Sequence, residues 1–260
     1  MRHRPGGRLA AVACILLSFA AAAEIAPSDR RSGYEFMGRA TRAMQDDDVA
    51  NPGMLWVLDG AALWNRTAGA AGRACADCHG DAAASMKGVA ARYPAFDPAR
   101  GRPINLEQRI NACRTGRQLL APLAYEGREL LSLAAYVARQ SRGLPIEIAV
   151  DERTRPFLDA GRAAFFRRQG QLNLACAQCH EERSGAKLAG NPIPQAHPTG
   201  YPLYRLEWQG LGSLQRRLRN CFVGVRAEAY EYGAPEYVDL ELYLMWRARG
   251  MKMESPAVRP

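Results

Sequence analysis

Two five-residue segments of the 260-residue sequence combine paired thiols with an imidazole: CADCH at residues 75–79 and CAQCH at residues 176–180. Two thiols three positions apart can form thioether bonds with the two vinyl groups of one haem, and the adjacent histidine then lies beneath the iron. A zinc site would need four ligands per cluster, and a redox dithiol would not need the following histidine twice. The sequence therefore predicts two covalently bound haem c groups. The residues of this prediction are Cys75, Cys78, Cys176 and Cys179 for attachment, and His79 and His180 for the two irons.

Each haem also needs a sixth iron ligand or an open coordination site, and two further cysteines recur at matching places. Cys113 and Cys221 lie 34 and 41 residues after the respective histidines. A disulfide between these two cysteines is one interpretation, because an oxidising compartment favours it. Their equivalent positions favour the other, in which each thiolate binds its own iron. The side chains that offer the more usual ligands do not recur in both halves; they are Met86, Met245, Met251, Met253 and His197.

An arginine lies four positions before each of these cysteines, Arg109 in the first copy and Arg217 in the second. On a helix, side chains four positions apart share a face. A guanidinium lowers the pKa of a neighbouring thiol and can hold an oxyanion through paired hydrogen bonds. Pairing with a haem propionate explains Arg109 equally well. Because the second copy adds Arg216 and Arg219, we expect its haem edge to face an anionic substrate.

The elements that position these residues also repeat. Residues 60–64 (GAALW) match residues 161–165 (GRAAF) at a spacing of 101 residues. Residues 106–113 (LEQRINAC) match residues 214–221 (LQRRLRNC) at a spacing of 108, so the second copy carries a loop seven residues longer. The sequence thus predicts a mainly α fold made of two tandem, duplicated cytochrome c-like haem modules with long loops rich in proline and glycine.

Hydrophobic spacing predicts the closing helix of each module. Apolar residues fall at i, i+3, i+4 and i+7 in residues 129–140 and, with one acidic interruption, in residues 237–247. Gly143 and Gly250 follow as helix stops. Residues 34–44 favour a short helix, and no sustained two-residue alternation predicts a sheet.

The first 23 residues have the features of a signal peptide: a basic start, an apolar stretch too short to span a bilayer, and small residues before Glu24. Cleavage would lower the net charge from +9 to +6 and leave no membrane span. The remaining chain divides into residues 24–150, an extension with the first module, and residues 151–260, the second module with the active site. Since no basic run contains interleaved aromatics, nucleic acid is not an expected partner.

The motifs together resemble the SoxA family, the dihaem subunits of the SoxAX cytochromes of bacterial thiosulfate oxidation. The resemblance rests on the two C-x-x-C-H segments, on residues 213–221 (SLQRRLRNC), and on residues 240–244 (LELYL) followed by Arg249 and Gly250. It covers nearly the whole chain after the leader. Because this chain keeps both the first haem motif and Cys113, it is similar to the dihaem members.

The resemblance implies a periplasmic enzyme, an L-cysteine S-thiosulfotransferase, that works as a heterodimer with a SoxX-type monohaem cytochrome c. It implies that thiosulfate is joined oxidatively to a cysteine of SoxY, within the SoxYZ carrier protein, forming a cysteine S-thiosulfonate. Two electrons would pass to the c-type haems and on to a downstream c-type cytochrome acceptor. Carried to matching positions, Cys221 would be a haem ligand and a cysteine persulfide intermediate, and Arg217 would bind substrate.

Two other classes of function stay open at this level. A dihaem electron carrier without its own chemistry would need the haems but no arginine near a reactive sulfur. A dihaem peroxidase would need an open iron and a distal acid or histidine, for which His197 is the one candidate. Because His197 lies among prolines, we interpret it as an ordinary loop residue.

Overall fold

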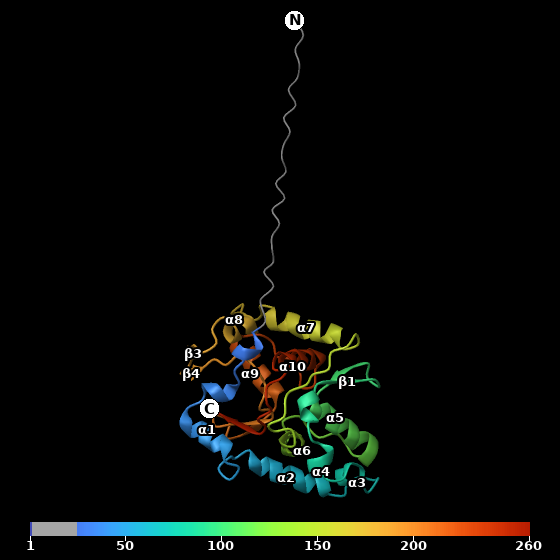
Figure 1. Cartoon of the computed structure of the whole chain (residues 1–260). Helices are drawn as coiled ribbons and strands as arrows, with labels where there is room; N and C mark the ends of the chain where they lie inside the picture. The colour runs from blue at the N-terminus through green and yellow to red at the C-terminus, as the bar shows by residue number, and fades with distance from the viewer. Residues whose placement is uncertain (2–24) are drawn as a thin grey trace.

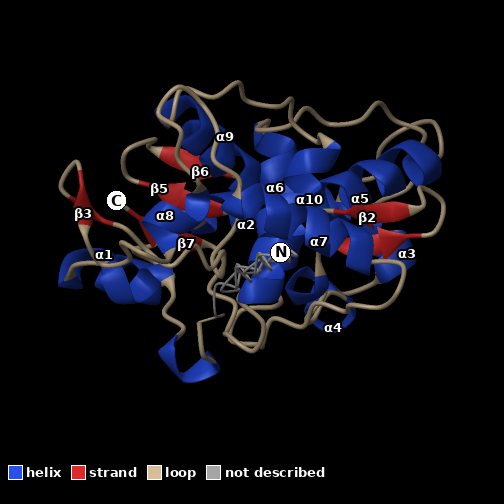
Figure 2. Cartoon of the chain, turned by 90° about the horizontal axis from the view of Figure 1, so that it is seen from above, coloured by secondary structure: helices blue, strands red, loops and turns tan. Residues whose placement is uncertain are grey.

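The computed structural model describes residue 1 and residues 25–260, so most of the expected signal peptide lies outside the described residues. Helices form most of the regular secondary structure and pack in the middle of the molecule (Figure 2). The prediction of a mainly α fold is confirmed. The structure also contains short strands, which the sequence did not predict because strands of two or three residues are too short for alternation to be visible.

The first repeat contains the expected helices together with two short strands and two turns that the sequence did not predict. They are α2 (Met54–Asn65), α3 (Cys75–His79), α4 (Ala82–Ser85), a 3-10 turn (Ala90–Arg92), β1 (Ala95–Asp97), β2 (Arg102–Ile104), α5 (Leu106–Cys113), a π-helical turn (Arg114–Gln118) and α6 (Arg128–Arg139).

The second repeat follows the same order. Its elements are α7 (Arg155–Phe166), α8 (Cys176–His180), β3 (Lys187–Leu188), β4 (Asn191–Pro192), β5 (Leu203–Arg205), β6 (Gly210–Gly212), α9 (Leu214–Gly224) and α10 (Pro235–Arg247). The β3–β4 hairpin lies in the longer loop of this repeat and has no counterpart in the first.

The two ends of the described chain pack against the second repeat. The N-terminal segment forms 3-10 turns at Pro27–Asp29 and Gly33–Phe36 and then α1 (Arg39–Asp46), so the helix expected over residues 34–44 is split in two. The last strand, β7 (Ala257–Arg259), pairs in parallel with β5, which also pairs with β6. In Figure 1 the C terminus lies beside α1, where the Gln45 side chain accepts a hydrogen bond from the backbone of Val258 at 3.0 Å.

The two repeats meet in two apolar contact zones, one of which joins Leu131 and Ala135 of α6 to Tyr204 of β5. The other zone includes the connection between the repeats. Ala138 from α6 and Met245 from α10 are buried there together with Ile146, which belongs to the connection between the repeats. The backbone of Ile146 bonds to Met251 and Gly250, at 2.9 Å each, so the connection is fixed against the end of the second repeat. Arg102 on β2 also pairs with Asp239 on α10 at 3.0 Å.

Each repeat is closed by one tight crossing of its first and last helices, α2 with α6 and α7 with α10. A Cβ atom added at Gly60 would lie 2.1 Å from the carbonyl oxygen of Ser132, and one added at Gly161 would lie 1.9 Å from that of Asp239. These distances are far below van der Waals contact, so only glycine lets the helices approach this closely. The two glycines are the matched residues at the spacing of 101.

We expect Gly161→Ala to lower the free energy of unfolding by about 3 kcal/mol, because the added methyl group forces α7 away from α10. Gly224→Ala is the matched control, since a Cβ there meets nothing within 4 Å, and it should change stability by less than about 1 kcal/mol. Thermal unfolding of the haem-loaded protein measures both. Equal melting temperatures for the two variants would contradict the proposed role of the crossing.

Candidate haem cavities and reactive cysteine

The two C-x-x-C-H segments form short helices that are capped in the same way. In α3 the carboxylate of Asp77 accepts a hydrogen bond from the backbone of Ala74 at 2.7 Å. In α8 the side chain of Gln178 accepts one from the backbone of Ala175 at 2.9 Å. These side chains are the variable residues inside the two motifs, so each motif supplies part of its own helix start.

The helices that carry the other two cysteines also begin in the same way. Asn105 accepts a hydrogen bond from the backbone of Gln108 at 2.9 Å and starts α5, which ends at Cys113. Ser213 accepts one from the backbone of Arg216 at 3.1 Å and starts α9, in which Cys221 lies three residues before the end. Both capping residues are small polar side chains of the type that favours helix N-termini.

The first repeat contains a cavity, open on one side, that is lined by His79, Cys113 and Arg109. Cys75, Cys78 and Met86 line it as well, and Leu133 and Val137 of α6 supply apolar wall. The structure therefore brings together every residue that the sequence assigned to the first haem. It also adds Met86, one of the alternative ligands.

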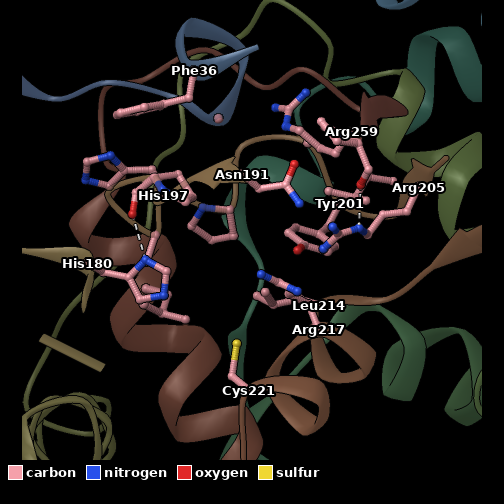
Figure 3. Close-up of a pocket in the computed structure, with 18 of the residues that line it drawn as sticks. Phe36, His180, Asn191, His197, Tyr201, Arg205, Leu214, Arg217, Cys221 and Arg259 are labelled. Atoms are coloured by element: carbon pink, nitrogen blue, oxygen red, sulfur yellow. Dashed lines mark hydrogen bonds between the residues drawn. The ribbon is translucent and has the colours of Figure 1, made fainter. Parts of the chain in front are cut away.

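The second repeat contains a cavity, open on one side, that is lined by His180, Cys221 and Arg217. Figure 3 shows the Cys221 sulfur and the Arg217 side chain on one side of this cavity and His180 on another. Cys176 and Cys179 are absent from its described lining. Cys176 nevertheless lies near Cys221. Burial raises the pKa of the Cys176 thiol to about 12, and the charge of a Cys221 thiolate contributes to the rise, which requires the two side chains to be near each other.

His180 is oriented by a hydrogen bond from its ring Nδ1 to the carbonyl oxygen of Pro194, at 2.6 Å. Because a carbonyl oxygen only accepts, Nδ1 carries the hydrogen and Nε2 keeps its lone pair. Burial lowers the pKa of His180, and this effect exceeds the opposing effect of the hydrogen bond. The ring is therefore neutral at neutral pH, the state that a metal-ligating histidine requires.

The residues present fit a haem in each cavity. Each cavity carries a histidine from a C-x-x-C-H segment and a cysteine from a separate helix, which are suitable iron ligands. Since Cys113 and Cys221 line different cavities and are both unpaired, the disulfide interpretation is wrong.

The basic cluster expected on α9 does not face the cavity as a unit. Of its three arginines only Arg217 lines the cavity. The guanidinium of Arg216 lies 4.3 Å from the centre of the Trp208 ring, and that of Arg219 lies 4.7 Å from the centre of the Tyr232 ring. Arg216 and Arg219 therefore turn away from the cavity, and α9 contributes the positive charge of Arg217 alone to its lining.

Several lining residues were not predicted from the sequence. Arg205 on β5 and Arg259 on β7 line the second cavity, as do Tyr201 and His197. His197 is buried, and its Nδ1 donates a hydrogen bond to the carbonyl oxygen of Arg31 at 2.9 Å. Burial lowers the pKa of His197 to about 4, so its ring is neutral. The interpretation of His197 as an ordinary loop residue missed its place in the cavity wall.

The N-terminal segment, which had no predicted role, supplies another part of that wall. Gly33, Phe36 and Met37 line the second cavity, and Figure 3 shows Phe36 above His197. The segment is held by the Gln195 side chain, which accepts from the backbone of Arg31 at 2.7 Å. A short extension outside the repeat thus completes the second cavity.

The fold and the two cavities define a c-type cytochrome with two modules, and comparison with known proteins agrees. The family model for the SoxA/TsdA cytochrome c domain matches residues 59–146 and 160–253. The L-cysteine S-thiosulfotransferase subunit SoxA of Pseudaminobacter salicylatoxidans is 39% identical over 246 residues, covering 94% of this chain and 86% of that protein. The subunit of the same name from Rhodovulum sulfidophilum is 38% identical, covering 88% of this chain and 80% of that protein.

A solved structure gives the same result. SoxXA from P. pantotrophus contains a chain that superposes with a TM-score of 0.86 at 32% identity, covering 89% of this chain and 87% of that one. The chain therefore belongs to the SoxA family of c-type cytochromes. Within residues 25–260, no helix combines the length and the apolar character needed to cross a membrane.

Replacing Cys113 tests which residue is the sixth ligand in the first cavity. We expect Cys113→Ala to keep both covalent haems by intact mass and to change the electron paramagnetic resonance signal of the ferric protein, because a thiolate donor is lost. Met86→Ala, the matched control from the same cavity, should leave that signal unchanged. The reverse pattern would assign the methionine as the ligand.

Proposed function

We propose that this chain is the dihaem subunit of a periplasmic L-cysteine S-thiosulfotransferase that oxidatively joins thiosulfate to a cysteine of a SoxY carrier protein. The observation that carries the proposal is that Cys221, Arg217 and His180 line one cavity. The relatives named above are described as subunits of this transferase, which supports the reaction class.

The residues of the second cavity suit this chemistry. The Cys221 sulfur, or the outer sulfur of a persulfide formed on it, forms a bond with the sulfane sulfur of thiosulfate, and two electrons leave. The carrier thiolate then attacks that sulfane sulfur and displaces the sulfur bound to it, which is regenerated as the Cys221 thiolate or as its persulfide anion. The sum consumes thiosulfate and a carrier thiol and yields a cysteine S-thiosulfonate, one proton and two electrons.

Arg217 is the residue that we assign to substrate binding. No described Asp or Glu side chain lines the second cavity, so its guanidinium remains available to the sulfonate oxygens. A guanidinium binds such oxygens through two parallel hydrogen bonds, which fix the orientation of the anion as well as its position. The sulfane end would then point toward Cys221.

The proposal includes two covalently bound haem c groups. We assign Cys75, Cys78, Cys176 and Cys179 to attachment, His79 and Cys113 to the first iron, and His180 and Cys221 to the second. The c-type haems supply the acceptor for the two electrons that the reaction releases. Removal of residues 1–23 as a signal peptide would place the first module (residues 24–150) and the second module with the active site (residues 151–260) in the periplasm.

The expected partners follow from the reaction and from the relatives. A SoxX-type monohaem cytochrome c would complete the heterodimer, in keeping with the SoxXA complex to which the fold is similar. The SoxYZ carrier would deliver the cysteine, and a downstream c-type cytochrome would remove the electrons. Thiosulfate is the small-molecule substrate.

We expect Cys221→Ala to retain two covalent haems and to lose thiosulfate-dependent modification of the carrier, because the sulfur that forms the mixed disulfide is gone. Conjugation is measured by the mass of the carrier after incubation with the reconstituted heterodimer and an oxidised cytochrome. Val223→Ala, at an exposed position of the same helix, is the matched control and should conjugate normally. Normal turnover by Cys221→Ala would leave electron transfer, without its own sulfur chemistry, as the role of this chain.

A further inference from the structure

The two repeats place equivalent residues around the helix that carries the cysteine. Four residues of the first repeat each have a counterpart 108 positions later in the second repeat. They are a tyrosine, a residue on the first strand of a hairpin, an arginine and the cysteine. The pairs are Tyr93 and Tyr201, Asp97 and Arg205, Arg109 and Arg217, and Cys113 and Cys221. The strand residues are structurally equivalent, because Asp97 opposes Arg102 and Arg205 opposes Gly210 in hairpins of the same register.

In the first repeat the arginine contacts both the strand residue and the tyrosine. The guanidinium of Arg109 pairs with the Asp97 carboxylate, Nη2 to Oδ2, at 3.4 Å. Its Nε donates a hydrogen bond to the Tyr93 hydroxyl at 3.3 Å. Asp97 is buried, with 6% of its surface exposed. Arg109, which lies four positions before Cys113, therefore already has a carboxylate of the protein beside it.

In the second repeat the carboxylate is replaced by Arg205, so the charge at this position is reversed. Figure 3 shows Arg205, Tyr201 and Arg217 gathered on the side of the cavity that holds Cys221. Burial, and then the charge of Arg217, lower the pKa of Arg205. Arg205 and Arg217 thus line one cavity whose described lining contains no Asp or Glu side chain.

The contacts of Arg205 hold its Nε and Nη2 in place. Its Nε donates to a backbone oxygen of Pro260, the last residue, where that oxygen is part of the α-carboxylate, at 2.9 Å, and its Nη2 lies 2.9 Å from the carboxylate of Glu207. Glu207 lies outside the cavity lining and its side chain is 63% exposed, so solvent screens this ion pair. The third arginine of the cavity, Arg259, differs because Glu254 lies against it and is itself largely buried.

Tyr201 completes the group with a neutral donor. Burial raises the pKa of the Tyr201 hydroxyl, and the nearby charges of Arg217 and Arg205 oppose this effect. The hydroxyl keeps its hydrogen at neutral pH and can donate to an oxyanion. In the first repeat the equivalent hydroxyl is already used by Arg109.

We propose that Arg205 and Tyr201, together with Arg217, bind the three sulfonate oxygens of thiosulfate and leave its sulfane sulfur facing Cys221. This inference rests on the proposed function and names two further substrate-binding residues for it. The exchange of Asp97 for Arg205 at one position of the duplicated hairpin is the feature that opens this anion site in the second repeat only.

The test measures thiosulfate kinetics and sulfate binding for the heterodimer carrying Arg205→Gln. A charge-assisted hydrogen bond contributes enough binding energy that its loss should raise the KM for thiosulfate about tenfold to a hundredfold. The turnover number should fall much less, because the anion is bound in the ground state as well as in the transition state. Inert sulfate, measured by calorimetry at low ionic strength, should bind more weakly by a similar factor.

Two further variants make the result specific. Arg205→Lys should recover part of the affinity because it restores the charge without the forked geometry. Arg205→Asp should give the lowest sulfate affinity, since it restores the residue of the first repeat beside Arg217. Arg168→Gln removes an exposed arginine of the same repeat outside the cavity lining and should leave both measurements unchanged.

An unchanged KM and an unchanged sulfate affinity in Arg205→Gln would overturn the inference. So would a shift in the reduction potential of the second haem without a change in KM, because this outcome would assign Arg205 to a haem propionate. Neither result touches the role of Cys221, whose test is the loss of conjugation in Cys221→Ala. Intact mass and melting temperature establish that each variant is folded with two haems.

Discussion

The structure depends on one close helix crossing that occurs twice. Gly60 and Gly161 allow α2 and α7 to touch the backbones of α6 and α10 at distances that no side chain permits. Each crossing fixes the helix that leads into a C-x-x-C-H segment relative to the closing helix of the same repeat. The cavity between them is then bounded by the cysteine-bearing helix, α5 or α9. The placement of a histidine and a cysteine around one space therefore follows from backbone packing.

The sequence predicted most of what is duplicated. Both haem segments, the pairing of Arg217 with Cys221 on one helix face, and the closing helices follow from residue types and spacing, and the structure agrees with the helices to within two residues. The sequence could not predict which residues the three-residue strands contribute to the second cavity. Arg205 and Arg259 reach the cavity from β5 and β7, which pair across more than fifty residues of sequence. Phe36 reaches it from a segment outside the repeat.

The differences between the repeats show how one scaffold is specialised. The first repeat neutralises its arginine with Asp97, whereas the second presents Arg205 at the same place. The second repeat also has a longer loop, a covering N-terminal segment and a third strand in its sheet. Each addition borders the cavity of Cys221. These differences support the proposal that the second repeat receives a small anion, because in the first repeat Arg109 is already paired with Asp97.

Sulfur chemistry on Cys221 can be tested directly by mass spectrometry. The heterodimer is incubated with thiosulfate and an oxidised cytochrome in the absence of carrier, digested without reductant, and analysed by peptide mass. We expect the added mass of one thiosulfate group on the peptide that contains Cys221, and none on the peptide that contains Cys113. An unmodified Cys221 peptide, or the adduct on Cys113, would contradict this expectation.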